Sequence, residues 1–276
     1  MWYAGTKIMT KKELLDRCAH DSDERILLAR VLDKLELTQQ RGIPGCTMFL
    51  SPAQQAAVTD LLTLWGSPRH VFFGGYPDAE RRLCAFLPDW QAEDTLWDEE
   101  EEHPLCVVEA EFSSGGDLSH RDLLGSLMGL GLTREKLGDI LQPEPTRAQV
   151  VALKEAGGIL TAQWESAGRH KCKSVKLIPL SQLAPRPPQV KTIRDTVATL
   201  RLDAVLASGF SLSRTKAAAY ISSGKVCINH RECLKNDKPV EEGDVLTCRG
   251  LGKCVIKEVT GQSRKGRIML VLERYI

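Results

Sequence analysis

The stretch from Arg201 to His230 restricts the fold of this chain more than any other part of the sequence. Leu202, Val205 and Leu206 recur at helical spacing and predict the buried side of a first helix. Gly209 is expected to end this helix, because glycine readily adopts the left-handed conformation found just past helix ends. The stretch therefore begins as a short helix with one apolar side.

A second helix is predicted directly after the first. Ser211 and Ser213 are both residue types that cap helix N-termini, and Gly224 is expected to end the helix. Arg214 and Lys216 fall in its first turn, where a helix presents unpaired backbone N–H groups and the positive end of its dipole. Two cations beside a helix N-terminus predict a binding site for phosphate.

Short strands and tight turns follow the second helix. Lys225–Asn229 predicts a strand that leads into a turn at Asn229 and His230, and Glu241–Val245 predicts a turn before a strand at Leu246–Arg249. Any one of these residues alone is typical of a solvated surface, and two short helices alone are typical of an ordinary helical hairpin. The ordered set of motifs, RLD, SRxK, GxVxxN and EEGD, is more specific.

This set resembles the S4 domain, a small module that binds folded RNA by its shape and phosphates and performs no chemistry itself. The resemblance implies RNA contacts at Arg201, Ser213, Arg214, Lys216, Lys225 and Asn229. His230 stands where the S4 pattern commonly has glycine. We expect His230, Arg231 and Lys235 to extend the RNA-binding set.

The charge of the chain is divided between its two ends. Residues 1–165 hold 16 of the 37 lysines and arginines and 27 of the 36 acidic residues, a net charge of −11. Residues 166–276 hold the remainder, a net charge of +12. Such a division predicts nucleic-acid contact through the basic end, with affinity that falls steeply as salt rises.

The first 69 residues are expected to form a mainly helical domain. Asp23–Leu37 carries an apolar stripe at helical spacing, and Met48–Leu50 predicts a short strand. Ser51 and Pro52 then supply a cap and a first-turn proline for a helix that ends near Trp65.

Residues 70–184 are expected to form a small α+β sandwich, because predicted strands and helices are mixed there. Strands are predicted at 71–73, 83–86, 106–112, 158–164 and 171–178, and helices at 120–130 and 147–155. Prolines at 185, 187 and 188 predict a stiff linker over 185–192, and residues 193–276 complete the S4 domain. The predicted class is therefore a multi-domain α+β protein.

Several classes of protein are disfavoured by what the sequence omits. It contains no run of about 18 apolar residues and no apolar signal-peptide core, so neither a membrane span nor secretion is expected. Its nine cysteines form no CxxC pair, which argues against a zinc ribbon and fits free thiols in a reducing cytoplasm. No catalytic, metal-binding or cofactor-binding constellation is predicted.

Four stretches in the same order resemble the YlmH-type S4 proteins, also called RqcP: Phe73–Trp90, His120–Leu141, the S4 stretch, and Cys248–Ile268. The resemblance implies an N-terminal domain, a central RNA-recognition-like α+β domain and a C-terminal S4 domain. It also implies binding to 23S rRNA and peptidyl-tRNA on stalled 50S subunits, and we expect the protein to be a monomer. There the protein is expected to support C-terminal alanine tailing of the stalled peptide beside an RqcH-type factor.

The same resemblance extends the candidate site into the tail and the central domain. Lys253, Arg264, Lys265 and Arg267 form a predicted cationic rim, and Cys254 stands where the family pattern has an aromatic residue, which weakens base stacking there. Two interpretations remain for the 120–136 region. Gly125 and Gly129 indicate a core helix built for close packing, whereas RNA contacts are the alternative for His120, Arg121, Arg134 and Lys136.

Two further functions are the alternatives to a non-enzymatic ribosome-binding factor. An S4-targeted RNA-modifying enzyme, either a pseudouridine synthase or a methyltransferase, needs a catalytic aspartate motif or a glycine-rich cofactor loop. Asp203 lies inside the predicted S4 helix, and the Gly74–Gly75 turn has too few glycines. A cell-division-linked interaction protein is the other alternative, and nothing in the residues supports it.

Overall fold

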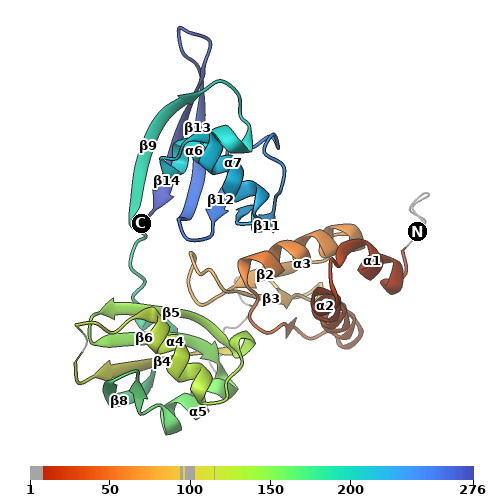
Figure 1. The fold of residues 1–276 in the computed structure, drawn as a ribbon. Helices are drawn as coiled ribbons and strands as arrows, with labels where there is room; N and C mark the ends of the chain where they lie inside the picture. Colours follow the sequence, from red (N-terminus) through yellow and green to blue (C-terminus); the bar gives the residue numbers. More distant parts are fainter. Residues whose placement is uncertain (1–8, 94–95, 97–102, 115) are drawn as a thin grey trace. The chain divides into compact units, whose positions relative to one another are not determined.

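The computed structural model describes residues 9–93, 96, 103–114 and 116–276. The chain divides into two compact units, Met1–Arg186 and Pro187–Ile276 (Figure 1). Both units contain helices and antiparallel sheets, which confirms the predicted α+β class. Among the helices in the described residues, none is long and apolar enough to cross a membrane.

Local capping signals define the helices that open the first unit: α1 (Lys11–Cys18), α2 (Ser22–Arg41) and α3 (Pro52–Trp65). Ser51 caps α3 in a reciprocal pair with Gln54, and Gly42 ends α2 in the left-handed conformation. The helices at 23–37 and 52–65 are confirmed. The predicted strand at Met48–Leu50 is wrong, because β1 is Gly45–Cys46 and Leu50 forms only an isolated bridge with Arg82.

Strand β3 (Leu83–Phe86) pairs with β1 on one side and with β2 (His70–Phe73) on the other, which gives the N-terminal sheet its order β1-β3-β2. The boundary predicted after residue 69 would place both strands in the central domain, whereas they belong to the N-terminal sheet. Phe49 and Leu83 share a core cluster with Val151 of the central part. Buried side chains thus tie the N-terminal and central parts into one unit.

The central sheet has the order β5-β6-β4-β8-β7. Its main connections run β4, α4, β5, β6, α5, β8, an arrangement of the split βαββαβ kind. Helices α4 and α5 cover one face (Figure 1). The bounds are β4 Leu105–Phe112, α4 His120–Gly129, β5 Leu137–Glu144, β6 Arg147–Leu153, α5 Lys154–Gln163, β7 Ser166–Ala167 and β8 His170–Ile178, with short 3-10 turns at Arg134–Lys136 and Leu180–Gln182.

Two predicted elements of the central part are wrong, because helix and strand are exchanged. Arg147–Glu155 was predicted as a helix but forms β6, and Gly158–Trp164 was predicted as a strand but lies mainly in α5. From Ala148 onward β6 is buried on both faces, so the alternation that marks a strand is absent. Gly157 lowers the helical signal of α5, yet a Cβ there would lie only 2.4 Å from Cys106 Sγ on β4.

The second unit packs α6 (Leu202–Phe210) and α7 (Arg214–Ser222) on one face of a sheet of order β11-β10-β12-β13-β14-β9 (Figure 1). Its strands are β9 Val190–Val197, β10 Val226–Ile228, β11 Arg231–Glu232, β12 Val245–Cys248, β13 Gly252–Gln262 and β14 Ile268–Tyr275. Part of the expected linker, from Val190, therefore belongs to this sheet.

The predicted end of α6 at Gly209 is wrong. Ser211, with φ 56°, is the left-handed residue that ends the helix. Gly209 is instead buried inside α6, where a Cβ would lie 2.8 Å from Cys254 Sγ. Gly224, with φ 68°, follows the end of α7 as expected.

Candidate nucleic-acid interface

Two of the predicted RNA-binding arginines meet at one carboxylate. Asp203, in the first turn of α6, is only 6% exposed. Arg201 Nε donates to its Oδ1 at 3.2 Å and Arg201 Nη2 to its Oδ2 at 3.3 Å, while Arg214 Nη2 donates to Oδ2 at 2.7 Å. We call these three residues the Asp203 cluster. It joins the starts of α6 and α7.

The Asp203 carboxylate is held in its ionised form. Burial by itself would raise the pKa of Asp203, but hydrogen bonds from Arg214 and Arg201 outweigh burial, and the pKa lies below its ordinary value. The arginine side chains remain 42% and 61% exposed, for Arg201 and Arg214 respectively. The cluster therefore has a buried anionic base and an exposed cationic surface.

The two helix N-termini differ in what they offer a ligand. The backbone N–H groups of Leu202 and Asp203 donate to the carbonyls of Lys238 and Asn236, so the start of α6 is closed by the protein itself. At α7, Ser213 is the N-cap, and its Oγ accepts from the N–H of Lys216 at 3.2 Å. The exposed side chain of Lys216 lies in the same first turn, which is the arrangement predicted for a phosphate site.

Asn229 serves a turn inside the protein. Its Nδ2 donates to Asp244 Oδ1 at 2.7 Å, and its Oδ1 accepts from Val245 N–H at 2.9 Å. These two contacts join Asn229 of the GxVxxN motif to Asp244 of the EEGD motif and to the residue after it. Asn229 and His230 have φ values of 48° and 66°, so His230 adopts the conformation that glycine favours.

The remaining predicted cations of this unit fall into two groups. Some are held by intramolecular contacts: Lys225 Nζ lies 5.6 Å from the Tyr220 ring centroid, Lys253 Nζ lies 4.0 Å from that of Tyr275, and Arg267 Nε donates to Thr196 Oγ1 at 2.9 Å. Others are exposed side chains in turns or at an edge: Arg231, Lys235, Arg264 and Lys265. Arg264 and Lys265 lie in the turn between β13 and β14.

Cys254 is fully buried in the core of the second unit, beside Gly209. An aromatic side chain at this position would point into the core and could not stack on an RNA base. The departure from the family pattern at Cys254 therefore concerns packing.

Two of the four central-domain candidates, His120 and Arg134, lie close enough for their charges to interact. His120 and Arg121 are exposed at the start of α4. Arg134 Nη1 donates to the carbonyl of Gly138, and Lys136 Nζ lies 3.0 Å from Glu155 Oε1. Partial desolvation of the His120 ring and the nearby charge of Arg134 lower the pKa of His120, which favours its neutral form.

The close-packing interpretation of α4 is wrong for its glycines. A Cβ built on Gly125 or Gly129 meets no atom within 4 Å, so both glycines face open space.

The face of the central sheet opposite its helices is occupied by polar contacts. Gln149 is 2% exposed, and its Nε2 donates to Glu109 Oε2 at 2.9 Å and to the carbonyl of Gln182 at 3.1 Å. The backbone N–H of Ala184 donates in turn to Gln149 Oε1. RNA-recognition sheets bind bases through exposed aromatic side chains on this face. Here the segment after β8 lies against buried amide and carboxylate groups.

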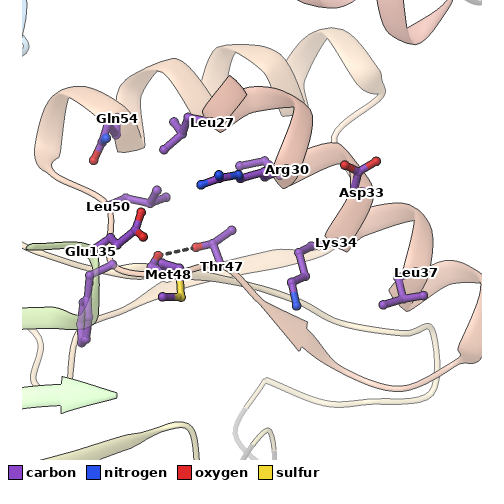
Figure 2. Close-up of a pocket in the computed structure, with 12 residues that line it drawn as sticks. Leu27, Arg30, Asp33, Lys34, Leu37, Thr47, Met48, Leu50, Gln54 and Glu135 are labelled. Atoms are coloured by element: carbon purple, nitrogen blue, oxygen red, sulfur yellow. Dashed lines mark hydrogen bonds between the residues drawn. The ribbon is translucent and has the colours of Figure 1, made fainter. Parts of the chain in front are cut away.

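Figure 2 shows a separate pocket of about 290 Å³ in the first unit. The pocket is lined by Leu27, Arg30, Lys34 and Leu37 of α2 together with Met48 and Leu50. Its lining is mainly apolar. In the described part of the chain, no group of three or more His, Cys, Asp or Glu side chains is placed to hold a metal ion.

Comparison with known proteins finds family matches for the second unit and for the central domain. Residues 200–246 match the S4 domain family, and residues 99–181 match a family described as the putative RNA-binding domain in YlmH. A cell division protein YlmH from Streptococcus pneumoniae has a solved structure that is 22% identical, with a TM-score of 0.47, and covers 59% of this chain and 96% of its own.

A longer similarity joins these regions. Ribosome-associated protein quality control protein P2 of Bacillus subtilis is 32% identical over 253 residues, which cover 91% of this chain and 95% of the relative. The order of the domains and the length of this similarity identify the chain as a member of the YlmH family of S4-domain proteins.

Proposed function

We propose that this protein binds rRNA and tRNA on the 50S ribosomal subunit and supports ribosome-associated quality control. Its role is non-enzymatic: it steadies the particle while a stalled peptide receives its C-terminal alanine tail. The Asp203 cluster is the observation that carries the proposal, because it holds two solvent-exposed arginines together in a matched S4 region. The name of the Bacillus subtilis relative supports the cellular setting.

Charge supports the same choice of surface. The second unit holds 16 lysines and arginines against 9 acidic residues, a net charge of +7. Phosphate contacts made by such residues release counterions from RNA, which gives the affinity its salt dependence. We propose 23S rRNA and peptidyl-tRNA as the RNA partners, an RqcH-type factor on the same particle, and a monomeric protein in the cytoplasm. His120 and Arg121 of the central domain are proposed as secondary contacts.

Sedimentation of cell lysate through sucrose gradients at low and moderate salt tests the proposal. We expect the protein to travel with free 50S subunits that carry peptidyl-tRNA, and to leave them as salt rises. The matched control is the Arg214→Ala, Lys216→Ala double variant, which should remain at the top of the gradient. If the wild-type protein stays at the top at every salt concentration, the proposed function is wrong.

A further inference from the structure

A carboxylate at the centre of a phosphate-binding surface should weaken binding by simple charge repulsion. Asp203 nevertheless lies between two arginines of the candidate interface. Its side chain is 9% exposed, whereas the arginines remain much more accessible. The carboxylate thus lies beneath the surface that the arginines form, and its contacts determine where both guanidinium groups lie.

The geometry of the three hydrogen bonds explains how it does so. Arg201 contacts both oxygens of Asp203 side-on, and Arg214 reaches Oδ2 by one nitrogen only. Because Oδ2 accepts from both residues, the two guanidinium groups lie next to each other. Each guanidinium has five N–H donors in a rigid planar fork, so donors remain on both for a further oxyanion. Two free arginine side chains would instead repel each other.

We propose that Asp203 is a positioning residue that assembles Arg201 and Arg214 into a clamp for a single RNA phosphodiester. This inference rests on the proposed RNA-binding function and deepens it. A phosphodiester offers two non-bridging oxygens, which match paired guanidinium donors. Arginine side chains held in place before binding lose less conformational freedom when RNA binds. Asp203 therefore contributes to affinity although its own charge opposes that of RNA.

The Asp203→Asn variant of the full-length chain separates positioning from charge. Asparagine removes one negative charge, so charge alone predicts tighter binding to purified 50S subunits. Loss of positioning predicts binding about tenfold weaker, because two side chains must then be ordered on binding. Asp237→Asn is the matched control, since Asp237 is an exposed carboxylate of the same unit and its loss changes net charge equally. Its binding should be unchanged or slightly tighter.

Arg201→Lys and Arg214→Lys provide a second test that keeps the charge and leaves Asp203 in place. Lysine is a point donor without the planar fork, so each variant should bind several-fold more weakly with an unchanged salt slope. Combining Arg214→Lys with Asp203→Asn should cost less than the sum of the separate effects, because both changes disrupt one clamp.

The outcomes distinguish the clamp from the proposed function. If the wild-type chain binds 50S subunits and the folded Asp203→Asn variant binds them equally well, the clamp is wrong but the proposed function stands. Full affinity in both lysine variants would overturn it as well, even if Asp203→Asn does not fold. Failure of the wild-type chain to bind 50S subunits would overturn the proposed function and the clamp together.

Discussion

Glu109 in the central sheet and Asp203 in the second unit are both buried carboxylates with basic neighbours, but their surroundings differ. Glu109 accepts from buried Gln149, and Arg147 and Lys176 lie 3.9 and 3.4 Å away. The segment after β8 contacts the same group of side chains through Gln149. At Asp203, the hydrogen bonds to the carboxylate come from the two arginines, whose side chains are 42% and 61% exposed.

The difference shows why similar ion pairs can have different uses. A polar group that is surrounded by the protein's own backbone supports the fold, whereas an anion beneath exposed arginines prepares a surface for another anion. We propose from this comparison that the main RNA contacts lie in the second unit, and the following predictions test that proposal.

The largest expected effect is on RNA affinity. Replacing both Arg214 and Lys216 with alanine should lower affinity for 50S subunits roughly hundredfold at low salt and reduce the salt slope by about two, because two phosphate contacts are lost. Lys176→Ala, on the central sheet, should change affinity less than twofold. Filter binding across a salt series measures both. A larger loss in Lys176→Ala would reverse the comparison.

The second prediction concerns independence of the units. A fragment of residues 187–276 should fold alone, since its core is formed by its own helices and sheet. It should bind 50S subunits within about tenfold of the full chain, because the proposed phosphate contacts all lie within it. Amide NMR spectra and the same binding assay test this. A disordered fragment, or one that binds 50S subunits far more than tenfold more weakly than the full chain, contradicts the prediction.

A helix glycine contacts a strand cysteine in both units, which allows a matched stability test. Gly157→Ala and Gly209→Ala should each destabilise the protein by about 1–3 kcal/mol, because the added Cβ would overlap Cys106 or Cys254. Gly158→Ala is the control in the same helix as Gly157. Its Cβ meets nothing within 4 Å, so it should stabilise the protein by about 0.5–1 kcal/mol. Urea unfolding measures each change, and equal effects at Gly157 and Gly158 would refute the packing explanation.

The pH dependence of stability should reveal Asp203. Its pKa is lowered in the folded state, so its ionised form stabilises the fold above the ordinary aspartate pKa of about 3.9. That contribution is lost as pH falls through the lower folded pKa. The stability difference between wild type and Asp203→Asn should therefore be about 1–2 kcal/mol at pH 7 and shrink below pH 4. A difference that stays constant down to pH 2 would contradict the ion-pair role.

The smallest effect is expected at His230. Glycine adopts its positive φ without the steric cost that a Cβ carries, although it loses more freedom on folding. His230→Gly should therefore raise stability by at most about 1 kcal/mol, as measured by thermal unfolding. A clear loss of stability would show that the imidazole makes a contact worth more than the relieved strain.

The sequence correctly predicted the helix ends and buried helix faces that depend on residues close together in the chain. Capping serines at 51 and 213, the left-handed Gly224 and the apolar spacing of Leu202, Val205 and Leu206 are confirmed, because each acts within a few residues. Local patterns gave the wrong secondary structure for β6 and α5, which were predicted as a helix and a strand. A strand buried on both faces does not alternate apolar and polar residues. Gly157 is required by its contact with Cys106, about 50 positions away in the chain.

The candidate site divides in the same way. The sequence by itself identified the S4 motifs and their cations, because their order and spacing along the chain are specific. Only the tertiary structure showed that Asp203 joins two of the arginines, that Asn229 holds a turn and that Arg267 contacts β9. Hydrogen bonds between side chains depend on where folding brings residues in space, and spacing along the chain does not specify those distances.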